Sequence, residues 1–128
     1  MTRYTRQIQL IGSENQAKLH RARVLVVGVG GLGCPVLELL CSAGIGTLGL
    51  VDFDKVELHN LHRQFLFAEK DVQQLKTAVA VERLQARNSD TIFRTYPYSL
   101  SAQNVFAIID GYDIVVDCTD NFAVRYLL

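Results

Sequence analysis

The sequence predicts an α/β fold in which an open, mostly parallel β-sheet carries helices on both faces and two further helices precede it. Three observations predict this architecture. Apolar, β-branched runs alternate with segments of helical periodicity, a glycine-rich turn joins the first run to the next helix, and carboxylates follow two of the runs. The 128 residues are 49% hydrophobic and 20% charged, which is enough for one core. We therefore expect one domain spanning residues 1–128.

The elements up to the first strand follow from local patterns. Residues 3–10 are expected to be helical, and Ser13 followed by Gln16 indicates a capping box for a second helix through Leu19. Residues 22–28 form a continuous apolar run that ends on glycine, which is typical of a strand covered on both faces. This run is the predicted first strand of the sheet.

The following segments alternate between helix and strand. Residues 32–44 have helical periodicity, with Pro35 in the first turn, where a missing N–H costs little, and Gly44 at the end. The remaining patterns predict a strand at 47–54, an irregular loop at 59–64, a helix at 71–88, a strand at 91–100, a helix at 101–111 closed by Gly111, and a strand at 113–120. Residues 121–128 begin as another helix, so the fold is expected to be truncated at its C-terminus.

Charge and cysteine content exclude several classes of partner. The basic and acidic residues, 13 of each, cancel to a formal net charge of zero, so neither nucleic acid nor a membrane surface is an expected partner. No apolar run reaches the ~18 residues of a membrane span, and the charged N-terminus argues against a signal peptide, so a cytoplasmic protein is expected. Cys34, Cys41 and Cys118 form no CxxC pair, which favours reduced thiols and argues against zinc within these residues.

The turn after the first strand carries a phosphate-binding pattern. Gly28, Gly30 and Gly33 satisfy G-x-G-x-x-G between a predicted strand and a predicted helix, and Gly31 lies inside the same turn. The first glycine permits a tight turn, the second lets a phosphate or ribose approach the backbone, and the third lets the helix pack on the sheet. The alternative is a tight turn without a ligand. The pattern in this context predicts a Rossmann-like nucleotide site.

An acidic residue marks the end of the second predicted strand. A carboxylate at the position of Asp52 can accept hydrogen bonds from a nucleotide ribose. Asp54 is close enough to compete for this role. We favour Asp52 because side chains alternate only while a strand remains regular.

A polar and basic block separates this sequence from a dehydrogenase. Asn60, Arg63 and Gln64 lie in the irregular loop, and Lys76 follows on the next predicted helix. Hydride transfer needs no such block, whereas attack on the α-phosphorus of a triphosphate needs cations for the charge that accumulates there and on pyrophosphate. We therefore expect Arg63 and Lys76 to be catalytic cations. For each residue taken alone, the alternative is an exposed surface charge.

Carboxylates also end the last predicted strand. Asp120 is expected at the carboxyl edge of the sheet, where it can hold Mg²⁺ directly or through water. Asp117 lies nearer the buried strand and could instead be a structural hydrogen-bond acceptor. Taken alone, Asp120 could equally be the N-cap of the final helix.

Together these motifs resemble the ThiF/MoeB family, relatives of the ubiquitin-activating enzymes that also include HesA. The resemblance covers essentially the whole chain and rests on six blocks in the family's order and spacing: Arg3-Tyr4-x-Arg6-Gln7, Gly28-x-Gly30-Gly31-Leu32-Gly33, Asp52-x-Asp54, Asn60-Leu61-x-Arg63-Gln64, Lys76, and Cys118-Thr119-Asp120-Asn121.

The resemblance implies a role for each motif. ATP would be bound by Gly28, Gly30, Gly31 and Gly33 of the glycine loop, by Asp52 at the ribose, and by Asn60, Arg63, Gln64 and Lys76 around the phosphates. Asp120 would coordinate Mg²⁺. Arg6 would reach the triphosphate of the neighbouring subunit, which implies a homodimer with two composite sites.

The implied reaction joins AMP to the C-terminal glycine carboxylate of a ubiquitin-like sulfur carrier of the ThiS or MoaD type, as in thiamine or molybdopterin biosynthesis. The chain would then be the ATP-binding N-terminal part of an adenylyltransferase domain, and incomplete as an enzyme. The zinc-binding and reactive cysteines of many members would lie beyond residue 128. The sequence departs from the family at residues 73–75, where glycine is common and Gln-Gln-Leu stands here.

Three other functions remain open at this point. The glycine pattern and Asp52 alone would also suit an NAD-dependent oxidoreductase, although Arg63, Lys76 and Asp120 would then have no role. A relative that adenylates a tRNA base or a peptide shares the same motifs. A non-catalytic subunit of an activating enzyme is the third alternative, and such subunits can lose phosphate-binding residues that are intact here.

Overall fold

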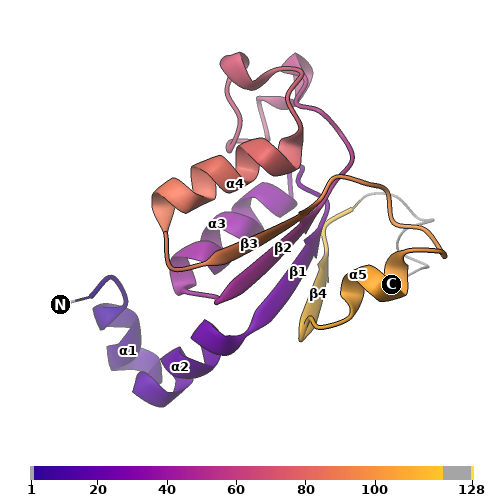
Figure 1. Ribbon diagram of the computed structural model, residues 1–128. Coiled ribbons are helices and arrows are strands. Elements are labelled where there is room, and N and C mark those ends of the chain that lie inside the picture. The colour runs from indigo at the N-terminus through magenta and orange to yellow at the C-terminus, as the bar shows by residue number, and fades with distance from the viewer. Residues whose placement is uncertain (1, 120–127) are drawn as a thin grey trace.

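The structure is a computed structural model that describes residues 2–119 and residue 128. Its elements follow one another as α1 (Thr5–Ile11), α2 (Ser13–Arg21), β1 (Arg23–Val27), α3 (Gly33–Ala43), β2 (Thr47–Val51), the short 3₁₀ helices η1 (Leu58–Asn60) and η2 (Glu69–Asp71), α4 (Lys76–Arg87), β3 (Ile92–Tyr96), α5 (Val105–Ile109) and β4 (Ile114–Asp117). Figure 1 shows this arrangement. The predicted order of helices and strands is confirmed over the described residues.

Four parallel strands form one sheet in the order β3-β2-β1-β4. β1 is internal, and its Leu25 pairs with Gly49 of β2 on one side and Val115 of β4 on the other. The chain moves outward from β1 to β3 and then returns to the far side of β1 (Figure 1). At such a reversal the loops after neighbouring strands diverge, which leaves a crevice at the carboxyl ends.

Helices cover both faces of the sheet, as predicted, because the side chains of β1 alternate between two buried environments. Val24 and Val26 belong to the larger core beneath α3 and α4, whereas Leu25 and Val27 belong to a smaller one beneath α5. In Figure 1, α3 and α4 lie on one side of the sheet and α5 on the other. Among the described residues, no helix combines the length and the apolar character needed to cross a membrane.

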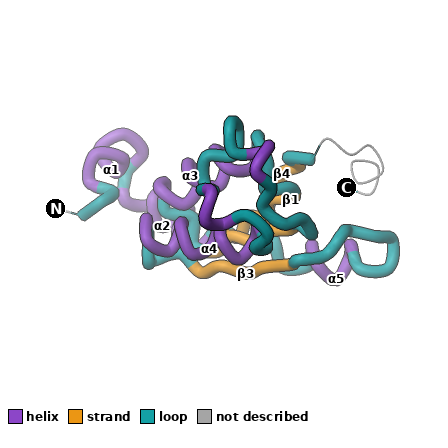
Figure 2. The backbone as a smooth tube through the Cα atoms, turned by 90° about the horizontal axis from the view of Figure 1, so that it is seen from above, coloured by secondary structure: helices purple, strands orange, loops and turns teal. Residues whose placement is uncertain are grey.

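The two N-terminal helices are fixed to the ends of α3 and α4. An Arg3 guanidinium nitrogen donates to the Arg87 carbonyl at 2.8 Å, and the Gln7 amide donates to the Ala43 carbonyl at 2.8 Å. The hydroxyl of Tyr4 accepts a 2.8 Å hydrogen bond from the Asn88 amide. Figure 2 shows α1 at one end of the molecule and α5 toward the other. Three side chains of the N-terminal motif therefore fix the first helices to the rest of the domain.

The predicted capping box of the second helix is wrong. Ser13 is the first residue of α2 and makes no capping hydrogen bond, while Gly12 precedes the helix with a positive φ of 86°. Gln16 is buried and donates instead to the Ala43 carbonyl at 3.1 Å. A tertiary partner at the end of α3 has therefore replaced the local one.

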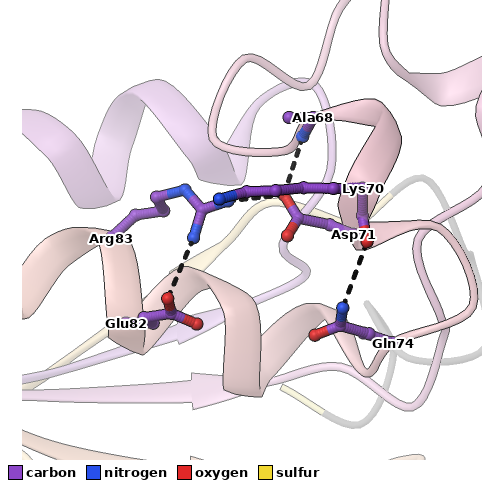
Figure 3. Close-up of polar contacts among 6 residues, drawn as sticks. All are labelled: Ala68, Lys70, Asp71, Gln74, Glu82 and Arg83. Atoms are coloured by element: carbon purple, nitrogen blue, oxygen red, sulfur yellow. Dashed lines mark hydrogen bonds and ion pairs between the residues drawn. The ribbon is translucent and has the colours of Figure 1, made fainter.

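A buried ion pair organises the loop before α4. Oδ2 of Asp71 accepts hydrogen bonds from the Ala68 N–H at 2.8 Å and from Arg83 of α4 at 2.7 Å (Figure 3). The Asp71 side chain is only 4% exposed, so losing either partner would leave a charge without compensation. This pair holds η2 against α4, and α4 begins at Lys76, not at residue 71 as predicted.

Gln73 is strained within this loop. Its φ of 74° makes it the only non-glycine residue in the described part of the chain with a left-handed backbone. Gln73→Gly should therefore raise the free energy of unfolding by about 0.5–1 kcal/mol, because relief of strain exceeds the added freedom of the unfolded chain. Urea denaturation monitored by circular dichroism measures the change.

Gln74→Gly is the matched control for this prediction. Gln74 has no positive φ, and its side chain donates to the Lys70 carbonyl at 3.2 Å (Figure 3). Glycine at residue 74 should lower the unfolding free energy by about 0.5–1 kcal/mol. Equal losses for the two variants would contradict the assignment of strain to Gln73.

Candidate nucleotide-binding site

A pocket of about 840 Å³ opens at the carboxyl ends of the four strands. Its volume is within the range of small-molecule and cofactor sites, roughly 300–1,000 Å³. The loops after all four strands contribute to its lining, which consists of Val27, Gly28, Gly30, Gly31, Leu32, Val51, Asp52, Phe53, Asp54, Lys55, Glu57, His59, Asn60, Arg63, Gln64, Lys76, Tyr98, Ser99, Leu100, Cys118 and Thr119. The sequence-predicted residues on these loops thus meet in one place.

The glycine loop turns too tightly for side chains at two positions. Gly28 has a φ of 99°, and an added Cβ would lie 2.9 Å from the Cys118 carbonyl oxygen. A Cβ at Gly33 would overlap the carbonyl oxygen of Gly28. Gly28 therefore allows the loop to pass close to β4, and Gly33 allows α3 to begin directly against the loop.

The other two glycines leave room beside polar side chains of the 59–64 loop. A Cβ at Gly30 would be 3.6 Å from Nε2 of Gln64, and one at Gly31 would be 3.5 Å from Cδ of Arg63. Arg63 and Gln64 thus lie against the glycine loop, although they are distant from it in sequence. The structure brings these two motifs together, and their roles at a nucleotide stay predictions.

Asp52 is held in place by the backbone on both sides. Oδ2 accepts a 2.8 Å hydrogen bond from the Val29 N–H of the glycine loop, and Oδ1 accepts one of 2.8 Å from the Asp54 N–H. β2 ends at Val51, so Asp52 and Asp54 both follow the strand and both line the pocket. Neither carboxylate lies within the strand, so the alternation of side chains along a strand is no reason to favour Asp52 over Asp54.

The carboxyl group of Asp54 has a raised pKa. Burial, together with the neighbouring negative charge of Asp52, raises the pKa of Asp54, while Lys76 opposes this rise. The Asp54 carbonyl also accepts a 3.1 Å hydrogen bond from the N–H of Lys76. Sequence patterns gave Asp54 only a competing role, yet it connects β2 to the start of α4.

Lys76 is a buried cation. It is the first residue of α4 and is 5% exposed. Among residues 2–119, no carboxylate lies within ion-pair distance of its amine. A buried ammonium without a paired anion is costly, and an anionic ligand in the pocket would compensate it. The alternative of an exposed surface charge is thus wrong for Lys76.

The 59–64 loop presents three further polar groups. The carbonyl of Asn60 accepts hydrogen bonds from the backbone N–H groups of Arg63 at 3.2 Å and Gln64 at 3.0 Å, which forms a compact turn. Arg63 is exposed, and its guanidinium donates to His62 Nε2 at 3.3 Å. Gln64 is 3% exposed, and no described residue hydrogen-bonds its Oε1. An orphaned buried acceptor beside the glycine loop fits a site that is completed by a ligand.

The end of β4 places Asp117 in a structural role. Its Oδ1 accepts hydrogen bonds from the backbone N–H of Thr119 at 2.9 Å and from the Thr119 hydroxyl at 2.6 Å. Asp120 and Asn121 lie outside the described residues, so Asp120 as a magnesium ligand stays a prediction. Among the residues that the structure describes, no three His, Cys, Asp or Glu side chains are grouped to hold a metal ion.

Arg6 does not reach this pocket in its own chain. It is exposed on α1, which is tied to the C-terminal ends of α3 and α4, whereas the pocket surrounds the start of α3. No described residue pairs with its guanidinium. A role for Arg6 at the site of a neighbouring subunit stays a prediction.

The cysteines are not activated as nucleophiles. Burial raises the pKa of Cys34 to about 11. Burial and the charge of Asp117 raise the pKa of Cys118, which borders the pocket. Both therefore remain thiols at neutral pH, which argues against Cys118 as a nucleophile.

Several residues of the pocket belong to none of the sequence motifs, so the sequence patterns did not predict them. Lys55, Glu57 and His59 precede the polar block, and Tyr98 to Leu100 follow β3. A general rule could have found the second group, since ligands in open α/β sheets bind where parallel strands end.

Comparison with known proteins places these motifs in a family. A family model described as the ThiF family matches residues 4–128. The sulfur carrier protein adenylyltransferase of Thermus thermophilus is 48% identical over 130 aligned positions, covering 100% of this chain and 48% of that protein. The adenylyltransferase and sulfurtransferase MOCS3 of Culex quinquefasciatus is 51% identical, covering 100% of this chain and 30% of that protein. The chain therefore spans half or less of the length of these curated relatives.

Solved structures share the same fold. The E. coli tRNA N6-threonylcarbamoyladenosine dehydratase TcdA in complex with ATP has a TM-score of 0.88 and 29% identity, covering 93% of this chain and 49% of that one. E. coli MccB with MccA-N7isoASN has a TM-score of 0.87 and 31% identity, and the match covers 98% of this chain and 39% of that one. With a family model that matches nearly all of its residues and a site built from the family's motifs, the chain belongs to the ThiF family.

Proposed function

We propose that the protein is an adenylyltransferase that uses ATP and Mg²⁺ to activate the C-terminal glycine carboxylate of a ubiquitin-like sulfur carrier. The observation that carries the proposal is that two cations and the glycine loop line the same pocket. Lys76 is buried in the pocket wall, and Arg63 lies against Gly31. A triphosphate that is attacked at its α-phosphorus needs this concentration of positive charge.

The proposed reaction assigns a task to each group. A carboxylate oxygen of the carrier attacks the α-phosphorus, the bond from that phosphorus to the bridging oxygen breaks, and pyrophosphate leaves with the electron pair. Arg63 and Lys76 stabilise the charge that develops on the transferring and leaving groups. Asp52 receives the ribose, and the Gln64 amide supplies a further polar contact beside Gly30. Mg²⁺, for which Asp120 is the proposed ligand, would neutralise part of the phosphate charge.

Relatives support a protein acceptor for the AMP group. The names of the relatives with 48% and 51% identity describe a sulfur carrier adenylyltransferase and an adenylyltransferase and sulfurtransferase. TcdA, whose name describes a tRNA dehydratase, is 29% identical. The difference in identity favours a sulfur carrier, of the ThiS or MoaD type, over a tRNA. Hydride transfer with NAD would give Arg63 and Lys76 no role in the chemical step, whereas adenylation uses both cations.

Arg6 supports a homodimer as the working form. Arg6 lies on α1, which is bonded to the C-terminal end of α3, whereas the pocket of the same chain surrounds the N-terminal end of α3. We therefore propose that Arg6 reaches the triphosphate in the other subunit. Each of the two sites would then contain residues of both chains.

Nucleotide preference and exchange activity of the full-length protein test this function. We expect Mg-ATP to bind more tightly than NAD in calorimetry, and labelled pyrophosphate to exchange into ATP when a ThiS- or MoaD-type carrier is present. Arg63→Ala should slow exchange on the order of 100-fold, because preorganised charge acts mainly in the transition state. Arg21→Ala, at an exposed position on α2 away from the pocket, is the matched control and should leave exchange unchanged. Tighter binding of NAD than of Mg-ATP would refute the proposal.

A further inference from the structure

The Asp52 carboxylate joins two parts of the candidate phosphate site. Its Oδ2 accepts the Val29 N–H within the glycine loop at 2.8 Å. Its Oδ1 accepts the Asp54 N–H at 2.8 Å. A charged acceptor strengthens each of these hydrogen bonds relative to a neutral one. The conformation of residues 28–30 and that of residues 52–54 are therefore fixed by the same side chain.

Asp54 extends this connection to the buried cation. Its carbonyl accepts the N–H of Lys76 at 3.1 Å, at the first residue of α4. Two further backbone bonds hold the adjoining segments together, from Val56 N–H to the Gln74 carbonyl and from Gln73 N–H to the Val56 carbonyl, both 2.8 Å. Three successive hydrogen bonds thus run from the glycine loop through Asp52 and Asp54 to Lys76.

A ribose would not have to displace these bonds. Each carboxylate oxygen has two lone pairs, so Asp52 can accept both N–H groups and ribose hydroxyls together. We infer that Asp52 is also a positioning residue for the phosphates, because it sets the glycine loop and Lys76 in register whether or not a ribose is bound. This inference rests on the proposed function and assigns Asp52 a task beyond the ribose contact.

Asparagine at this position separates the two tasks. Asp52→Asn keeps the size of the side chain but has one acceptor oxygen, and its amide nitrogen would face an N–H donor. It can therefore hold Val29 or Asp54, but not both. Asp113→Asn is the matched control, since Asp113 Oδ2 likewise accepts a backbone N–H, that of Arg23 at 2.8 Å, at the opposite edge of the sheet.

The decisive ligand is 2′,3′-dideoxy-ATP, which has the triphosphate but neither ribose hydroxyl. If Asp52 serves only the ribose, full-length wild type and Asp52→Asn bind this nucleotide equally in calorimetry. We expect the variant to bind it at least about tenfold more weakly, as loss of a hydrogen bond to a charged group predicts. Asp113→Asn should bind it like wild type. Equal affinities of wild type and Asp52→Asn would overturn the inference.

Amide hydrogen exchange without nucleotide gives a second, independent readout. In wild type, the amides of Val29, Asp54 and Lys76 should open as one unit with similar protection, and all three should exchange faster in Asp52→Asn. This wild-type measurement decides the matter even if the variant does not fold. Unrelated protection at the three amides would contradict the coupling. A wild type that binds neither ATP nor the dideoxy analogue would refute the proposed function, while the exchange data would still decide the role of Asp52.

Discussion

Gly33→Ala should abolish nucleotide binding and lower the free energy of unfolding by about 3 kcal/mol, a large effect for the addition of one methyl group. The methyl would overlap the backbone carbonyl oxygen of Gly28, and because Cβ is bonded directly to Cα, no side-chain rotation can move it away. Either α3 must withdraw from the sheet or the loop must open. Each change would remove the surface on which the phosphates are expected to lie. Calorimetry with Mg-ATP and denaturant unfolding measure the two losses.

Gly12→Ala is the matched control for this substitution. Gly12 has a φ of 86° with nothing within 4 Å of an added Cβ, and it lies before α2, outside the pocket lining. Alanine there should cost about 1–3 kcal/mol through backbone conformation alone and leave ATP affinity unchanged. Retained ATP affinity in Gly33→Ala would show that the close contact between Gly33 of α3 and Gly28 does not shape the glycine loop for the nucleotide.

The second large effect is expected from Arg6. Arg6→Ala and Lys76→Ala in the full-length protein should each remove nearly all carrier-dependent pyrophosphate exchange, because each lacks one cation proposed for the triphosphate. If Arg6 acts across a two-fold dimer, mixing the two variants restores activity. Random exchange makes half of the dimers mixed, and each mixed dimer has one intact site and one doubly damaged site. About a quarter of all sites should then recover.

The opposite arrangement has a distinct outcome. If Arg6 served its own subunit, every site in the mixture would keep one lesion and activity would stay near zero. Subunit exchange is verified with differently tagged chains, and Arg21→Ala mixed with Lys76→Ala shows the level expected when one partner is fully active. An inactive mixture after verified exchange would rule out the trans assignment without affecting Arg63 or the glycine loop.

Features that depend on local chemistry were predictable from the sequence. The strand before Gly28 is a continuous apolar run, and Gly44 ends α3 with a φ of 92°, as its position suggested. The glycine loop could be placed because its spacing reflects steric limits that act within a few residues. That Arg63 serves the same ligand as this loop was predicted from its charge and from the family resemblance, because nothing in the 59–64 segment itself specifies which surface it contacts.

Features set by tertiary contacts were less predictable. Helical periodicity suggested a helix from residue 71, but Asp71 is turned toward Arg83 and Gln73 adopts a left-handed backbone, so α4 starts at Lys76. Gln16 looked like half of a capping box, yet its partner is the Ala43 carbonyl. In both cases a residue distant in sequence competes with the local hydrogen bond, which a linear pattern does not reveal.

The strand order also determines when each wall of the pocket is made. β1, β2 and β3 are paired in the order of the chain, whereas β4 returns to β1 only after these three strands have been synthesised. Closing that long loop costs more entropy than pairing neighbouring βα units. On the ribosome, the glycine loop, Asp52 and Lys76 are therefore synthesised before Asp117 and Thr119. A nascent chain thus contains the cation of the pocket, Lys76, before it contains the Asp117 carboxylate of β4.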